Sequence, residues 1–130
     1  MKTNPTIFIA DDDEEDIALL KDSLTERNAM VDPMTFHNGV VLLNYLKTNN
    51  DVLPDLIILD INMPIKNGFL TLHELKEHPL FKSIPVIMLT SSVREEDKTR
   101  SYEMGCISFF KKPDSLPDYI NLAERILLLA

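Results

Sequence analysis

Two strongly apolar runs of the sequence end on aspartate. Residues 55–60 read DLIILD and close on Asp60, and residues 6–10, TIFIA, are followed at once by Asp11 and Asp12. A buried carboxylate with no partner is strongly disfavoured, because the charge loses its hydration. These aspartates therefore need a cation, hydrogen-bond donors or a chemical task.

Hydroxyl and ammonium groups follow two further apolar runs. Thr90 and Ser91 come after the run PVIML, and Lys111 and Lys112 come after the run ISFF. Hydroxyl and ammonium donors bind phosphoryl oxygens, and a carboxylate can attack phosphorus to form an acyl phosphate. Clustered carboxylates without His or Cys favour a hard divalent ion, Mg²⁺ or alternatively Mn²⁺. If these residues meet, the chemistry indicated is metal-assisted phosphoryl transfer to an aspartate.

The spacing of apolar residues predicts strands that alternate with helices. Short runs with β-branched or aromatic residues predict strands at 6–10, 33–36, 55–60, 85–89 and 107–110. Three- and four-residue spacing predicts helices at 14–27, 39–48, 67–77, 94–104 and 116–129. This alternation predicts an α/β fold, a (βα)5 doubly wound parallel sheet. Ligands of such sheets lie beyond the carboxyl ends of the strands, so a strand order 2-1-3-4-5 would bring Asp11, Asp12 and Asp60 together.

Composition limits the class of protein. The 130 residues, 45% of them hydrophobic, are expected to form one domain over residues 1–130 without an output domain. A formal net charge of −8 argues against binding to nucleic acid or to an anionic membrane. The single cysteine, Cys106, excludes an internal disulfide, and no apolar segment is long enough to span a bilayer. We therefore expect a cytoplasmic protein with no membrane or nucleic-acid partner.

Four motifs together resemble the response-regulator receiver domain of bacterial two-component signalling. They are the acidic pair Asp11–Asp12, the motif D-x-N-M-P-x-x-N-G at residues 60–68, the pair Thr90–Ser91, and the pair Lys112–Pro113. The resemblance covers essentially the whole chain. It implies the flavodoxin-like fold with strand order 2-1-3-4-5.

The resemblance also implies a role for each matching residue. Asp60 would accept a phosphoryl group from a sensor histidine kinase or a His-phosphotransfer protein. Asp12, Asp60 and the backbone carbonyl of Asn62 would bind Mg²⁺ directly, and Asp11 would act mainly through metal-bound water. Thr90 and Lys112 would contact the phosphoryl oxygens.

Signal output is a further implication of the resemblance. Phe109 falls at the aromatic switch position that moves inward when Thr90 engages the phosphoryl group, and the Lys112–Pro113 peptide would be cis. Such a domain catalyses only its own phosphorylation and dephosphorylation, so it is not classed as an enzyme. It would signal to a downstream protein whose identity the sequence does not give. The face formed by residues 94–104, 107–110 and 116–129 is a candidate for homodimer contacts.

Simpler interpretations fit some of these residues. Residues 13–16, DEED, are better explained as a helix N-cap and first-turn acids than as further metal ligands, although the choice of Asp11 and Asp12 over Asp13 depends on where the first strand ends. Asn67 and Gly68 fit a turn and a helix start. Taken alone, Thr90 and Ser91 could cap the fourth helix.

Two other functional classes remain as alternatives. A phosphatase of the haloacid-dehalogenase type also uses an aspartyl nucleophile, and D-x-D occurs as Asp11 and Asp13. A flavin-binding or inert flavodoxin-like module shares the fold, but acids follow the first strand here in place of a glycine- and hydroxyl-rich phosphate loop.

Overall fold

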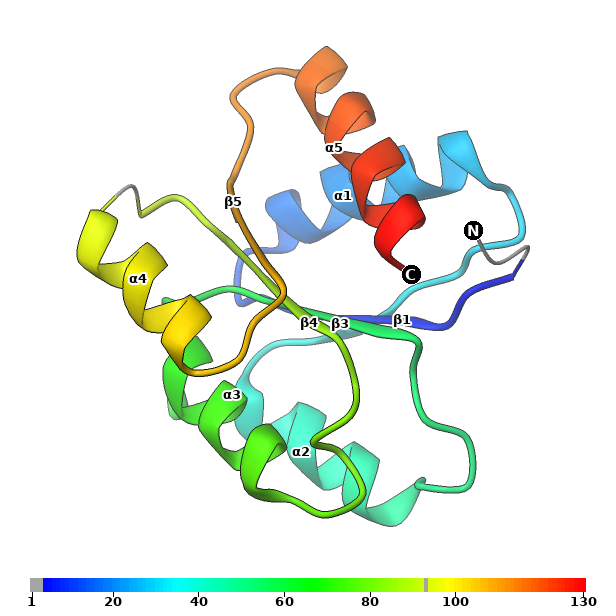
Figure 1. The fold of residues 1–130 in the computed structure, drawn as a ribbon. Coiled ribbons are helices and arrows are strands. Elements are labelled where there is room, and N and C mark those ends of the chain that lie inside the picture. The colour runs from blue at the N-terminus through cyan, green and yellow to red at the C-terminus, as the bar shows by residue number, and fades with distance from the viewer. Residues whose placement is uncertain (1–3, 93) are drawn as a thin grey trace.

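The computed structural model describes residues 4–92 and 94–130, in which five strands alternate with five helices (Figure 1). The strands are β1 (Ile7–Ala10), β2 (Met34–Phe36), β3 (Leu56–Leu59), β4 (Val86–Thr90) and β5 (Ser108–Lys111). The helices are α1 (Glu14–Arg27), α2 (Gly39–Thr48), α3 (Gly68–Glu77), α4 (Glu95–Glu103) and α5 (Leu116–Leu129). Each predicted element is therefore present, with its ends within two residues of the prediction.

All strand pairs are parallel and the order is β2-β1-β3-β4-β5, which confirms the predicted flavodoxin-like sheet. The order reverses between β1 and β3, whose final residues Ala10 and Leu59 are register partners. The residues that directly follow these two strands, Asp11 and Asp60, therefore lie at the same edge of the sheet.

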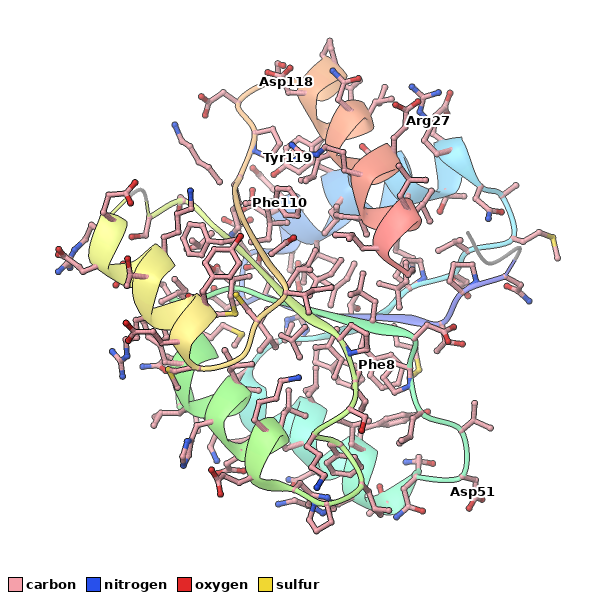
Figure 2. The ribbon with its side chains drawn as sticks, viewed as in Figure 1. Phe8, Arg27, Asp51, Phe110, Asp118 and Tyr119 are labelled. Carbon is pink, nitrogen blue, oxygen red and sulfur yellow. The ribbon has the colours of Figure 1, made fainter. Side chains whose placement is uncertain are left out.

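Helices cover both faces of the sheet and enclose two apolar cores. One core packs β-strand side chains against α2 and α3, and the other packs them against α1 and α5 (Figure 1). Figure 2 shows Phe8 on the α2–α3 side, with Phe110 and Tyr119 on the opposite side. Every residue of β3 and β4 is buried, as expected for central strands covered on both faces. Each large apolar side chain buried in this way contributes about 1.5–3 kcal/mol.

Short polar side chains fix where the helices begin. Asp13 is the N-cap of α1 and accepts hydrogen bonds from the backbone N–H groups of Glu15 (3.0 Å) and Asp16 (3.1 Å). Asn67 caps α3 through the N–H of Leu70 (2.9 Å), as the turn-and-start interpretation predicted. These caps place the first turns of α1 and α3 beside the carboxyl ends of β1 and β3.

None of the helices formed by the described residues is both long and apolar enough to cross a bilayer.

Candidate functional site

Three carboxylates meet at the carboxyl edge of the sheet. One oxygen each from Asp11, Asp12 and Asp60 lies within 4.8 Å of the others. Asp11 and Asp60 are each only 5% exposed, whereas Asp12 is open to solvent. Like charges this close repel one another unless a cation joins them. An all-oxygen donor set with one open side fits Mg²⁺ or Mn²⁺, which prefer carboxylates and retain water ligands.

Two backbone hydrogen bonds and the close approach of Gly68 fix the backbone around Asp60. The N–H of Asp60 donates to the Ala10 carbonyl on β1 (3.0 Å), and the N–H of Gly68 donates to the Ile61 carbonyl (2.8 Å). A Cβ at Gly68 would lie 2.3 Å from the backbone oxygen of Asp60, so only glycine lets α3 start this close to the site. Ile65, in the same loop, has φ of 67° and is exposed, an arrangement that costs a β-branched residue about 1–3 kcal/mol.

Lys112 supplies the positive charge at the centre of the site. Its Nζ lies 2.8 Å from Oδ2 of Asp11, 2.7 Å from Oδ2 of Asp16 and 3.0 Å from Oδ2 of Asp60. Lys112 is 8% exposed, whereas the neighbouring Lys111 points outward and is exposed. Alternation along β5 thus places Lys112, and not Lys111, beside the carboxylates.

The isomer of the Lys112–Pro113 peptide bond differs from the expectation. The family resemblance implied a cis bond, but no cis peptide occurs in residues 4–92 and 94–130. Trans is the intrinsically preferred isomer before proline, by about 0.5–1 kcal/mol. In the trans form the Lys112 side chain still reaches the carboxylates of Asp11 and Asp60.

Burial and pairing shift the pKa values of three groups at the site. Burial is the largest influence on Asp11, and with the nearby Asp60 charge it outweighs Lys112 and raises the pKa of Asp11 to about 6. Burial lowers the pKa of Lys112, but its hydrogen bonds to the three carboxylates outweigh this and leave that pKa above its usual value. Burial, followed by the negative charge of Asp16, raises the pKa of Tyr119 to about 12. The ammonium of Lys112 is therefore firmly protonated, and Asp11 takes up a proton under mildly acidic conditions.

Thr90 and Phe109 lie on the same face of the sheet, on the neighbouring strands β4 and β5. Thr90 is fully buried at the end of β4, and its Oγ1 accepts a hydrogen bond from the Ser92 N–H (3.3 Å). Phe109 is half-buried and is the register partner of Met88, which shares a sheet face with Thr90. The N-cap of α4 is Arg94, so the interpretation of Thr90 and Ser91 as a helix cap is wrong.

Asn62 lies next to the acid cluster through its backbone. Its N–H donates to Oδ1 of Asp60 at 3.4 Å, and the residue is exposed. The use of its carbonyl as a metal ligand stays a prediction.

Asp16 is the residue of this site that the sequence interpretation did not include. It was expected to serve only as a first-turn acid of α1, yet its carboxylate binds Lys112 from 96 residues away in the sequence. The available signal was its place as the third residue of α1, because helical side chains lean toward the helix N-terminus and hence toward this edge of the sheet.

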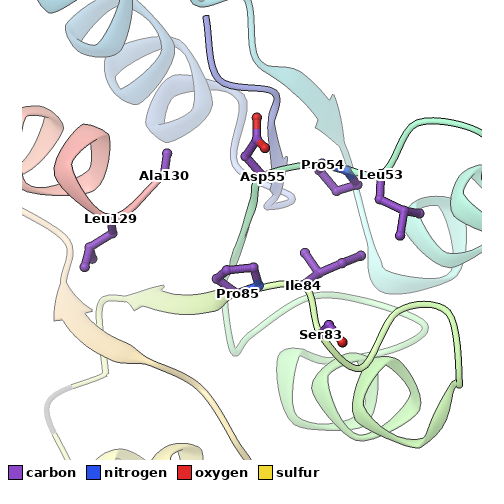
Figure 3. A pocket seen from close by; sticks show the side chains of 8 residues that line it. All are labelled: Leu53, Pro54, Asp55, Ser83, Ile84, Pro85, Leu129 and Ala130. Atoms are coloured by element: carbon purple, nitrogen blue, oxygen red, sulfur yellow. The ribbon is translucent and has the colours of Figure 1, made fainter. Parts of the chain in front are cut away.

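The pocket in Figure 3 lies at the other end of the sheet. Asp55 and Pro85, at the amino ends of β3 and β4, line this hollow of about 380 Å³ together with Leu129 at the end of α5. It is mainly apolar and contains none of the carboxylates discussed above. The chemistry therefore belongs to the carboxyl edge of the sheet.

Known proteins resemble this chain along nearly its full length. Response regulator Rcp1 of Synechocystis sp. is 30% identical over 131 residues, which cover 96% of this chain and 89% of Rcp1. The phosphorylated cyanobacterial phytochrome response regulator RcpA superposes with a TM-score of 0.87 at 31% identity, covering 95% of this chain and 91% of RcpA. The Mn²⁺-bound form of Rcp1 superposes with a TM-score of 0.84 at 29% identity, covering 94% of this chain and 91% of that one.

Other relatives contain a similar segment within a longer protein. The sensor histidine kinase CheAY of Helicobacter pylori is 33% identical over 98% of this chain, but the match spans only 16% of CheAY. The family model for the response regulator receiver domain matches residues 7–124, which include every residue of the carboxylate cluster and Lys112. The chain therefore belongs to the response regulator receiver domain family.

Proposed function

We propose that this protein accepts a phosphoryl group on Asp60 from a phosphohistidine of a sensor kinase or a His-phosphotransfer protein. The observation that carries the proposal is the position of the Lys112 ammonium, 3.0 Å from Oδ2 of Asp60 and adjacent to the Asp11–Asp12–Asp60 cluster. A nucleophile, a site for a divalent cation and a donor for phosphoryl oxygens are thereby in contact. This is the set of groups that phosphoryl transfer to a carboxylate requires.

The transfer exchanges one bond for another. An Oδ atom of Asp60 attacks the phosphorus, the new O–P bond forms as the N–P bond of the phosphohistidine breaks, and the departing imidazole keeps the electron pair and takes a proton. Lys112 and the Thr90 hydroxyl bind the equatorial phosphoryl oxygens. Asp11, Asp12, Asp60 and the carbonyl of Asn62 would hold Mg²⁺ or Mn²⁺, which offsets the negative charge that builds up on the phosphoryl oxygens.

In this proposal the signal is carried by a change of surface. The face made by α4, β5 and α5 carries exposed Tyr102, Ile107 and Leu116, and Phe109 is part of its strand β5. A rearrangement of Phe109 after phosphorylation would reshape this face for a downstream protein. We place a homodimer contact on the same face. We expect the phosphodonor and the target to be met in the cytoplasm.

The relatives support the proposal by analogy. RcpA has been observed phosphorylated and Rcp1 with Mn²⁺ bound, and both share the fold and about 30% of their sequence with this chain. CheAY is a histidine kinase that carries a similar segment.

The proposal is tested by labelling with a small phosphodonor such as acetyl phosphate in the presence of Mg²⁺. We expect one acid-stable, base-labile phosphoryl group per chain, lost in Asp60→Asn and after chelation of the metal. Lys112→Ala tests the role proposed for the ammonium group. Lys111→Ala is its matched control, because the two lysines are adjacent but only Lys112 reaches Asp60. Labelling of Asp60→Asn at the wild-type level would refute the proposal.

The same experiment separates the alternatives. A haloacid-dehalogenase-type phosphatase would carry the label on Asp11, whereas a receiver carries it on Asp60. Peptide mapping after borohydride reduction of the acyl phosphate locates the modified residue. A yellow protein with a flavin absorption spectrum would instead favour the flavodoxin-like alternative.

A further inference from the structure

Each hydrogen of the Lys112 ammonium has a carboxylate acceptor in the structure. An ammonium group has three donors, and Nζ is 2.8 Å from Asp11, 2.7 Å from Asp16 and 3.0 Å from Asp60. The shortest of these contacts is to Asp16. A phosphoryl oxygen can therefore bind Lys112 only where one of these carboxylates gives way.

The three carboxylates differ in what else they must bind. Asp11 and Asp60 belong to the cluster that can hold a divalent cation, and Asp60 also receives the phosphoryl group in the proposed function. Asp16 lies outside that cluster, on the first turn of α1. When the metal and the phosphoryl group engage Asp11 and Asp60, Asp16 is the acceptor that remains for Lys112.

The position of Asp16 is also restrained by its surroundings. Its backbone N–H is bound by the N-cap Asp13 at 3.1 Å, and α1 packs along α5. Its side chain is 29% exposed, but the partner Lys112 is nearly buried. Water screens a pair of this kind less than it screens a surface ion pair. The contribution of a surface ion pair to stability is often negligible.

We propose that Asp16 is a positioning residue for phosphoryl transfer, which holds the Lys112 ammonium from the α1 side while Asp11 and Asp60 exchange it for metal and phosphoryl group. This inference rests on the proposed function of Asp60. Asp16 is not a member of the metal cluster and its carboxylate binds Lys112, so it acts through Lys112. Loss of its carboxylate leaves Lys112 free to turn toward Asp11 and Asp60, away from the geometry that the transfer needs.

The test compares Asp16→Ala, Asp16→Asn and Glu15→Ala with wild type. Glu15 is an exposed acid in the same helical turn, so Glu15→Ala removes the same charge without touching Lys112. The initial rate of labelling by acetyl phosphate is measured at saturating Mg²⁺ over a range of donor concentrations. Binding of Mg²⁺ is measured separately by calorimetry, and the thermal midpoint checks that each variant is folded.

We expect Asp16→Ala to lower the maximal labelling rate by about tenfold, as loss of one charge-assisted hydrogen bond implies. Its Mg²⁺ affinity should change no more than that of Glu15→Ala, because Asp16 is not in the metal cluster. Asp16→Asn should recover part of the rate, since its amide oxygen can still accept from Lys112. A purely structural role for Asp16 would not produce this pattern of rate loss, unchanged metal binding and rescue.

Two results would overturn the inference while leaving the proposed function intact. One is a labelling rate for Asp16→Ala within about twofold of wild type, and the other is an equal loss of rate in Glu15→Ala. If the wild-type protein is not labelled on Asp60 at all, the proposed function fails and this inference falls with it. The contact can also be tested independently of labelling, by NMR of the Lys112 ammonium protons. We expect these protons to exchange slowly with solvent in wild type and in Glu15→Ala, and fast in Asp16→Ala.

Discussion

The carboxyl group of Asp11 makes the site sensitive to pH. Burial and the neighbouring charge of Asp60 raise its pKa to about 6, so the folded protein binds this proton more tightly than the unfolded chain does. The metal-free protein should therefore lose this part of its stability as the pH rises from the usual carboxyl range through about 6. In the proposed metal site, Mg²⁺ and the proton would compete for this carboxylate.

We therefore expect the Mg²⁺ affinity to fall as the pH is lowered through about 6. Calorimetric titrations with Mg²⁺ at about pH 7.5 and about pH 5 measure this change, with proton release on binding detected from the dependence on buffer ionisation enthalpy. In Asp11→Asn the affinity should be lower and its dependence on pH flatter. Equal wild-type affinities at the two pH values would contradict the assignment of Asp11 to the metal site.

Individual site residues differ in how well the sequence identified them. Asp60 could be placed, because it directly follows an apolar strand and the strand ends meet at one edge of the sheet. Lys112 could be chosen over Lys111 because it precedes Pro113, as in the family motif, and because adjacent side chains alternate between faces. Asp16 could not be identified, because its place in the first turn of α1 already explained an acid there. Its contact with Lys112 depends on how α1 and β5 are set against each other, which no local pattern encodes.

The contact between α4 and β5 includes a side chain that binds the backbone of the strand. The hydroxyl of Tyr102 on α4 accepts a hydrogen bond from the N–H of Phe109 at 3.1 Å. β5 is an edge strand that pairs with β4 on one side only, and Tyr102 supplies an acceptor for a backbone N–H of this strand. Tyr102 thus couples the position of α4 to the backbone of the residue expected to act as the switch.

Tyr102→Phe should weaken that coupling without emptying space in a core, since Tyr102 is 45% exposed and lies outside both cores. We expect the free energy of unfolding to fall by about 0.5–1 kcal/mol and the Phe109 amide hydrogen to exchange faster with solvent. Tyr45→Phe is the control, because Tyr45 packs against Phe8 of β1 and Phe36 of β2, at the opposite edge of the sheet from β5. Unchanged exchange at Phe109 would mean that this hydrogen bond does not hold α4 to β5.

Helices and strands were predictable because their signals are local. α1, α2 and α5 have the predicted ends, and β3 stops one residue earlier than predicted, at Leu59. The peptide before Pro113 was not predictable in this way, because its isomer depends on the conformation of the whole loop. The family resemblance implied cis, and the bond is trans.

The cluster of Asp11, Asp12 and Asp60 lies at one edge of a sheet whose two faces are packed. Packed cores transmit displacements because their side chains have few alternative positions. Thr90 is fully buried at the carboxyl end of β4, and Phe109 packs against the α2–α3 core from β5. A movement of Thr90 toward a phosphoryl group on Asp60 would vacate space that the Phe109 ring can enter.

The last prediction concerns this coupling across the whole protein. A ligand shifts a conformational equilibrium only by its differential affinity, so the unmodified protein should already populate the state with Phe109 inward as a minority. Beryllofluoride with Mg²⁺, which mimics the phosphoryl group, should move amide chemical shifts at Asp60 and also at Phe109, α4 and α5. Thr90→Ala should keep the changes near Asp60 and lose most of those on α4, β5 and α5. Wild-type shifts confined to the loops around Asp60, or undiminished shifts at Phe109 in Thr90→Ala, would show that the signal leaves the domain by another route.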